Sequence, residues 1–550
     1  MRATYYVGTL ASDRPTAGGT GVALSGGGSR ALACALGALR GLVGLDLLGS
    51  VDYLSSVSGG SWAAGPFVYL PASILDAEFL GRPESPTEVR WGPASGPGTP
   101  GDLTYVPPHG LAAIPEGLSI QGMLELALEL EKTKSVPDGR IWGRVCESVF
   151  LAPFGLGAAH PADAGRRFMG YTSDWLQQHV LRLEGNGGLA DSDFDLYSSD
   201  RPRPFALINT SLFLEPREAD SKLVGLEVTP TGTGVPASFP GDGLGGGDVG
   251  GGWMESFAYG ADRYTTVPTA RTVTLTSLRD RFGLGDAVGA SSAVFAEECH
   301  KQLITHTGKD NPFVELIPTY PYSSPIDLEK GDGGSAPYPL ADGGSMENTG
   351  VVALLRHGVD RVAAFVSCGT PISRDSKTGQ VVVDAQLPPL FGMQPHVSGA
   401  AYRSYRDPLL DPTFADFRHN RVFPEDRFDG LLKALGDAAD SGEGAVCLQE
   451  LDVVPNPYQG VAPRKGVRVL WVYNQASSEW RDQLSEGVRT ALDSDAKFAS
   501  FPNFPTQELS LTSRQVNLLA NLTCWKVMSG SPGFAGPKYA GQFRALFQDT

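Results

Sequence analysis

Three turns of this chain carry residues that could do chemistry, and two of them are rich in glycine. The first, "SGGGSRA" (Ser25–Ala31), places three consecutive glycines between an apolar run and a run rich in alanine and leucine. Glycines leave the backbone N–H groups bare, so this turn could cradle a phosphate group or stabilise an oxyanion. A tight turn that needs positive φ would have the same composition.

The second turn, "SVSGGSW" (Ser56–Trp62), places Ser58 between an apolar run and a helix-like run, with glycines at the next two positions. A nucleophilic serine at a strand-to-helix turn needs small neighbours, because its backbone is strained and its hydroxyl must project into the open. A string of serine and glycine is also common in plain turns. The candidate nucleophile is Ser58.

The third turn, "ADGGSMEN" (Ala341–Asn348), offers an acid. Asp342 precedes a glycine turn that leads into an apolar, helix-like run and then a strand. Asp332 stands in a similar string, "GDGGS", but with loop-like sequence on both sides. Context therefore separates Asp342 from Asp332 as the candidate acidic site residue.

The elements around these turns alternate between strand-like and helix-like patterns. An apolar run at 21–26 precedes helical spacing over 29–45, and a second strand pattern follows at 51–57. Further strands are expected at the segments 204–213, 271–278, 361–368 and 468–474. This order predicts an α/β fold, with a mostly parallel central sheet and helices on both faces. Ligand sites of such sheets lie at the carboxyl ends of strands, where both glycine-rich turns fall.

The chain is long enough to contain more than the sheet. Residues 1–380 are expected to form a catalytic core, with a cap insertion at about 65–203 because so long a connection exceeds an ordinary loop. Residues 381–550 are expected to be the C-terminal part of the same catalytic domain. Within the insertion, 121–132 is predicted to be a helix, and the glycine-rich stretch 241–253 is predicted to be a flexible loop.

Composition excludes some classes of function. The 550 residues carry a formal net charge of −17, which disfavours nucleic acid as a partner. The six cysteines show no metal-ligand spacing, and we expect no metal and no cofactor. We see no secretory signal and no apolar run of the roughly 20 residues that a membrane span needs. A cytoplasmic protein is expected, with peripheral contact to membranes.

One alternative uses the first turn alone. Residues 26–31 match the G-x-G-x-x-A fingerprint of dinucleotide-binding proteins, and Asp46 lies near the position of the ribose-binding acid. This hypothesis leaves Ser58 and Asp342 without a role.

Together, "SGGGSR", "SVSGGSW" and "ADGGSMEN" resemble the motifs of the cytosolic phospholipase A2 and patatin-like acyl hydrolases, including the phospholipase B group, in the same order. The resemblance extends less specifically to Gly283–Glu298 and to "FPNFPTQEL" near the C-terminus. It implies a patatin-like α/β fold and a serine acyl hydrolase that cleaves ester bonds of phospholipids or lysophospholipids at a lipid surface. One departure stands out, because Ser56 occupies the first glycine position of the G-x-S-x-G elbow.

The resemblance also implies roles for individual residues. Ser58 and Asp342 would form a catalytic dyad that needs no histidine. Arg30 would bind the substrate phosphate and Asn348 would support the aspartate loop, although a structural cap is an equal explanation for Asn348. The oxyanion hole would consist of Gly27, Gly28 and Gly59. A catalytically inactive lipid- or partner-binding member of the same scaffold is the alternative.

Overall fold

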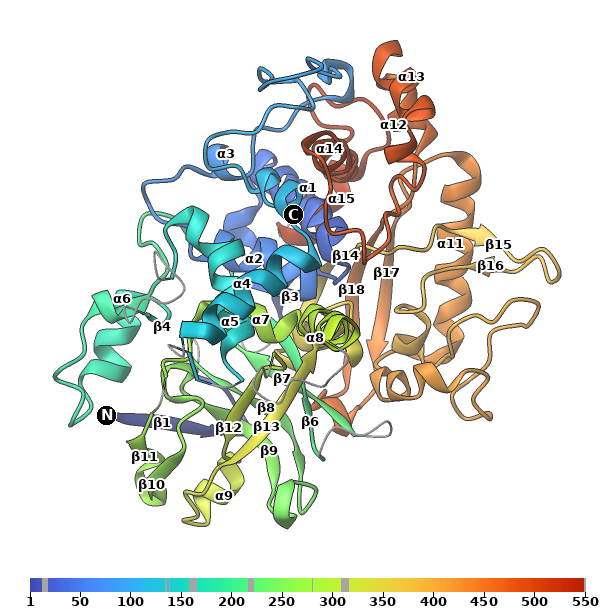
Figure 1. Cartoon of the computed structure of the whole chain (residues 1–550). Coiled ribbons are helices and arrows are strands. Elements are labelled where there is room, and N and C mark those ends of the chain that lie inside the picture. The colour runs from blue at the N-terminus through green and yellow to red at the C-terminus, as the bar shows by residue number, and fades with distance from the viewer. Residues whose placement is uncertain are drawn as a thin grey trace.

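The computed structural model describes residues 1–11, 18–133, 136–137, 139–157, 166–215, 222–278, 280–307 and 316–548. The described chain is built around one 14-stranded sheet with helices packed about it (Figure 1). The α/β fold class predicted from the sequence is confirmed.

Five neighbouring strands form the parallel centre of the sheet. In spatial order they are β6 (Phe205–Phe213), β3 (Tyr53–Val57), β2 (Gly19–Leu24), β14 (Val359–Val366) and β18 (Arg464–Tyr473). Every residue of β2 and β3 is buried, so both faces of the sheet are covered here. The turns that follow β2 and β3 lie side by side, because adjacent parallel strands end at the same edge.

The expectation of a mostly parallel sheet holds only for this centre. Antiparallel strands extend it on both sides and also pair with β6. Most of these strands follow one another through short connections, which permit antiparallel but not parallel pairing. The antiparallel strands are β1 (Arg2–Val7), β7 (Leu223–Val228), β8 (Thr233–Phe239), β9 (Val249–Met254), β10 (Arg263–Val267), β11 (Thr272–Ser277), β12 (Thr319–Tyr322), β13 (Ala336–Asp342) and β17 (Val446–Val453).

The prediction of a flexible loop over 241–253 is wrong for its second half, which forms β9. Gly250 and Gly252 have positive φ, and a Cβ at either would lie within 2 Å of a backbone oxygen on a neighbouring strand (1.8 Å and 1.9 Å). The glycines here permit close strand approach at an irregular pairing, a use of glycine that composition alone does not distinguish from flexibility.

Helices cover the parallel centre. After β2, α1 (Gly28–Gly44) packs along α14 (Ser513–Met528), and α10 (Val351–Arg356) packs on β2 and β3. Helix α14, dark red in Figure 1, lies beside α1. The other helices outside the insertion are α2 (Ser61–Val68), α7 (Leu284–Ser291), α8 (Val294–Thr307), α9 (Pro325–Glu329), α11 (Phe428–Ser441), α12 (Ser478–Gln483), α13 (Glu486–Ser494) and α15 (Tyr539–Phe547).

The long connection between α2 and β6 contains α3 (Asp76–Phe79), α4 (Ile120–Thr133), α5 (Ile141–Cys146) and α6 (Ser173–Trp175). The predicted helix at 121–132 is α4. Within the described residues, no single helix has both the length and the apolarity for crossing a membrane; by those two criteria alone, the sharply bent pair Leu111–Gly117 and Ile120–Thr133 passes together.

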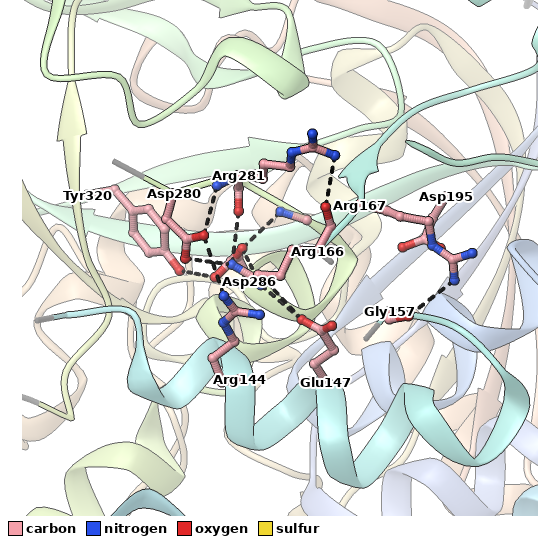
Figure 2. A network of polar contacts seen from close by, with 11 residues as sticks. Arg144, Glu147, Gly157, Arg166, Arg167, Asp195, Asp280, Arg281, Asp286 and Tyr320 are labelled. Carbon is pink, nitrogen blue, oxygen red and sulfur yellow. Dashed lines mark hydrogen bonds and ion pairs between the residues drawn. The ribbon is translucent and has the colours of Figure 1, made fainter. Parts of the chain in front are cut away.

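A buried charge cluster ties this insertion to α7 (Figure 2). Arg166 pairs with Glu147, Asp280 and Asp286 at 3.0, 3.0 and 2.7 Å. Tyr320 donates a hydrogen bond of 2.8 Å to Asp286. Burial acts to raise the pKa of Asp286, but Arg166 holds that pKa below its usual value. The cluster fixes the start of α7, whose other end reaches the glycine-rich turns.

We predict that Arg166→Met lowers the free energy of unfolding by about 3–5 kcal/mol, because three carboxylates lose their shared cation in a buried site. Urea-induced unfolding measures this loss. The matched control is Lys433→Met, which removes an exposed pair with Asp437 and should cost at most about 1 kcal/mol. Equal effects of the two substitutions would contradict a structural role for the cluster.

Candidate active site

Ser58 lies in the turn between β3 and α2 with a strained backbone. Its φ is +48°, in the left-handed region of backbone conformation that residues other than glycine rarely adopt. Ser56 lies within β3 as an ordinary strand residue, so the elbow does not need glycine at that position. Such strain in a strand-to-helix turn is typical of a serine whose hydroxyl must be presented to a partner.

The two glycines after Ser58 are required by close backbone approach. A Cβ at Gly59 would lie 2.2 Å from the carbonyl oxygen of Gly28, and one at Gly60 would lie 2.5 Å from that of Leu24. The turn that carries Ser58 therefore packs directly on the turn that carries the three consecutive glycines.

Asp342 meets Ser58 from a strand far along the chain. It ends β13, which pairs with β6, and its Oδ2 accepts a hydrogen bond of 2.9 Å from the Ser58 Oγ, 284 positions away. Its Oδ1 accepts the backbone N–H of Gly344 at 2.7 Å. Ser58 and Asp342 are each 4% exposed. The structure thus brings the predicted nucleophile and the predicted base together.

Burial changes the acidity of Asp342. It raises the pKa of the carboxyl to about 7, although the hydrogen bonds from Gly344 and Ser58 act in the opposite direction. A carboxylate with a pKa near neutrality is a much better base at pH 7 than an exposed one.

The other serines of this turn have structural partners. Ser55 donates a hydrogen bond of 2.7 Å to the carbonyl of Gly350, and Ser61 contacts the hydroxyl of Ser56 at 3.0 Å. Ser58 alone among the four contacts a carboxylate in the contacts described, which separates it from the neighbours that crowd it in the sequence.

The glycine turn before α1 presents free backbone donors. Gly27 caps the helix with φ +139° and Gly28 begins it, and the first helical bond runs from the N–H of Ala31 to the carbonyl of Gly27. Among the described residues, no acceptor is found for the N–H groups of Gly27 and Gly28. Since Gly28 packs on Gly59, these donors lie beside the Ser58 turn.

Asn348 lies between the glycine turn and the Asp342 turn. A Cβ at Gly26 or Gly344 would come within 2.2 or 2.5 Å of its Oδ1. Its backbone carbonyl accepts the N–H of Gly26 at 3.1 Å, and its Nδ2 donates to Gln386 at 3.3 Å. Asn348 therefore contacts both turns, as a supporting residue would.

Arg30 has partners within the protein. Its guanidinium is buried and donates to the carbonyls of Ser367 (3.0 Å) and Phe504 and to the hydroxyl of Thr506 (3.2 Å). The C-terminal segment thereby holds the start of α1. The phosphate contact expected of Arg30 stays a prediction.

The dinucleotide hypothesis fits poorly. Asp46 follows the C-terminal end of α1, so about 25 Å of helix separates it from Gly28. A ribose-binding acid should instead stand near the phosphate-binding turn, at the end of the next strand. Among the described residues, no group of three or more His, Cys, Asp or Glu is placed to hold a metal ion.

Sequence reasoning missed Ser291, which closes α7. Its buried Oγ accepts the backbone N–H of Ser58 at 2.9 Å and donates to the carbonyl of Asn209 at 2.7 Å. The contact links the strained turn to β6 and to the helix that the charge cluster anchors. Only its place in "GASSAVF" hinted at a role, through the weak resemblance of Gly283–Glu298.

No protein-family model matches the chain, and no curated protein matches its sequence. Among solved structures, human GIVD cytosolic phospholipase A2 aligns with a TM-score of 0.50 and 13% identity, over 97% of this chain and 63% of that one. Two complexes of the human protein with methyl gamma-linolenyl fluorophosphonate, one also holding terbium chloride, give TM-scores of 0.39 and 0.43 at 12% and 13% identity, over 98% of this chain and 59% and 60% of theirs.

This chain has a cytosolic phospholipase A2-like fold. It spans less than two thirds of the human chains to which it is similar. The resemblance drawn from the three motifs is confirmed at the level of the fold. A sequence identity of 13% shows a shared fold and does not show a shared activity.

The raised pKa of Asp342 predicts a pH-dependent cost to folding. A carboxyl whose pKa is about 7 in the folded state, against about 3.8 unfolded, stabilises the fold fully below pH 4 and loses that contribution as pH rises through 7. Asp342→Asn does not titrate. Between pH 5 and pH 8 it should therefore gain about 3 kcal/mol of unfolding free energy relative to the wild type, measured in urea. A difference that is constant with pH would contradict the raised pKa.

The hydrogen bond from Ser58 to Ser291 predicts a positioning effect. For the ester hydrolysis proposed below, Ser291→Ala should lower kcat on a p-nitrophenyl ester by roughly tenfold and leave KM unchanged, because the Ser58 turn loses a buried acceptor. The matched control is Ser292→Ala, whose equally buried hydroxyl donates to the carbonyl of Val288 and has no contact with Ser58 in the contacts described. If the two variants lose kcat equally, Ser291 has no specific role.

Proposed function

We propose that this protein is a serine acyl hydrolase that cleaves carboxylic ester bonds of phospholipids or lysophospholipids. The single observation that supports this proposal most strongly is the 2.9 Å hydrogen bond from the Ser58 Oγ to a buried carboxylate beside free helix N-terminal amides. The fold shared with human cytosolic phospholipase A2 agrees with it.

In the proposed first step, Asp342 removes the proton from the Ser58 hydroxyl as its Oγ attacks the ester carbonyl. The carbonyl oxygen becomes an oxyanion, which the N–H groups of Gly27, Gly28 and Gly59 stabilise. Each such donor is worth about 3–4 kcal/mol of barrier in enzymes that use this device. The tetrahedral intermediate then expels the alcohol, which takes the proton from Asp342, and leaves an acyl-serine.

In the second step, a water molecule attacks the acyl-serine and gives its proton to Asp342. Collapse of the second tetrahedral intermediate releases the fatty acid and returns the proton to the Ser58 Oγ. Because Ser58 and Asp342 are 4% exposed, substrate entry requires the residues that cover them to move.

The remaining roles are also part of the proposal. Arg30 has five N–H donors, and those not used on Ser367, Phe504 and Thr506 would meet the substrate phosphate. Asn348 would hold the Asp342 turn. We place the protein in the cytoplasm, acting at lipid surfaces, with residues 1–380 and 381–550 as one catalytic unit and about 65–203 as its cap.

The test is release of fatty acid from mixed phospholipid vesicles, followed by mass spectrometry. Ser58→Ala and Asp342→Ala should each lower the rate by roughly a thousandfold or more, because each removes a member of the dyad. The matched controls are Ser56→Ala and Asp332→Ala, which change a neighbouring serine and a similar acidic turn. Both should keep most of the activity.

Two outcomes would contradict the proposal. Full activity in either dyad variant would exclude the pair, and no release by the wild type would leave a lipid- or partner-binding protein. Since the dyad needs no histidine, alanine at each histidine in turn should preserve activity; an essential histidine would indicate a serine–histidine–aspartate triad instead. The histidines are His109, His160, His179, His300, His306, His357, His396 and His419.

A further inference from the structure

A cavity of about 440 Å³ lies away from Ser58 and Asp342, neither of which lines it. It is lined by Arg40 of α1, by residues of the segment 75–112 of the insertion and by Asn517 and Asn521 of α14. Its volume falls within the roughly 300–1,000 Å³ of small-molecule sites. The proposed hydrolase does not use it.

Arg40 lies at the inner side of this cavity with an incomplete set of partners. It is 7% exposed, and its Nε donates to the carbonyl of Leu80 at 2.8 Å. Among the described residues, neither Nη atom finds a hydrogen-bond acceptor, and no carboxylate comes within 4 Å. Burial lowers the pKa of this guanidinium, and nearby Cys524 and Glu84 do not offset it. Neither Nη atom is among the fully buried unpaired atoms, so both are donors open to an anionic ligand in the cavity.

The rest of the wall limits what the anion can be. Apolar side chains line much of the cavity: Leu75, Phe79, Leu80, Val89 and Leu103. Three carboxylates, those of Glu78, Glu84 and Asp102, also line it against two guanidiniums, those of Arg40 and Arg82. The excess of negative charge would repel a multiply charged anion. The lining therefore favours a ligand with one negative charge and an apolar body.

We propose that this cavity binds a single-chain amphiphile with one anionic headgroup, of the fatty acid class. The carboxylate contacts the Nη atoms of Arg40 in a bidentate pair, and the chain packs on the apolar wall. Fatty acid is also the product class of the proposed hydrolase, but binding here needs neither Ser58 nor Asp342.

The experiment is isothermal titration calorimetry of the full chain with sodium octanoate. Octan-1-ol supplies the same chain length without charge, and sodium acetate supplies the headgroup without the chain. Octanoate should bind once per chain, and at least tenfold more tightly than either control ligand. Octanol or acetate binding as tightly as octanoate would overturn the assignment.

Variants then locate the site. Arg40→Gln should weaken octanoate binding at least tenfold, and Glu84→Gln should strengthen it severalfold because a like charge is removed. Arg489→Gln, on α13 and outside the cavity lining, should match the wild type. Unchanged affinity of Arg40→Gln for octanoate would overturn the proposal. If circular dichroism shows that Arg40→Gln does not fold, the test is Glu84→Gln. Octanoate binding by Glu84→Gln that is unchanged or weaker than in the wild type would then overturn the proposal.

Ser58→Ala separates this proposal from the catalytic one. It should bind octanoate as the wild type does, because the two sites share no side chain. If the wild type binds octanoate but releases no fatty acid from vesicles, the proposed hydrolase activity is contradicted and the proposed cavity site is not. Loss of octanoate binding in Ser58→Ala would show instead that the ligand occupies the Ser58 site, and would overturn the separate cavity.

Discussion

The hydrogen bond between a buried hydroxyl and a buried carboxyl depends on the whole architecture around it. Ser58 and Asp342 are 284 positions apart, yet their oxygens lie 2.9 Å from each other because β3 and β13 both pair with β6. A small shift in register on either side of β6 would separate the pair. The antiparallel strand β13 is thus as important to the site as the parallel centre that carries Ser58.

Burial raises the pKa of Asp342, which makes the carboxylate a better base. The same burial destabilises the fold at neutral pH, where the carboxyl must ionise in a buried site. Contacts from the surrounding structure offset this loss of stability and hold the strained backbone of Ser58. Gly344 bonds the carboxylate, Ser291 bonds the backbone of Ser58, and a buried charge cluster anchors the other end of the helix that carries Ser291. Local strain and unfavourable burial that the surrounding structure must compensate are usually found at functional sites.

The sequence predicted those parts of the site whose causes are local. Ser58, the glycines around it and Asp342 stand in turns whose chemistry is visible in a few residues, and the structure brings them together. Ser291 could not be found this way, because its role arises from a tertiary hydrogen bond to a backbone N–H 233 positions away. Arg30 was a candidate from the sequence, but its contacts with Phe504 and Thr506 were not predicted, because these partners come from the far end of the chain.

The fold shows the same division. The alternation of strands and helices predicted the α/β class and the centre of the sheet, since the central strands are short, largely apolar segments and β2 and β3 are wholly buried. Of the antiparallel extension, the sequence predicted the strand at 271–278, which is β11, but not β9. Strand β9 is rich in glycine and is held by its neighbours rather than by its own propensity.

The most direct test of the central claim is to map the serine that reacts with a fluorophosphonate lipid analogue, by peptide mass spectrometry of the labelled protein. The account predicts a single adduct on Ser58 in the wild type, and no adduct when Asp342 is replaced by asparagine. An adduct on Ser55, Ser56 or Ser61, or undiminished labelling of Ser58 in that variant, would contradict it.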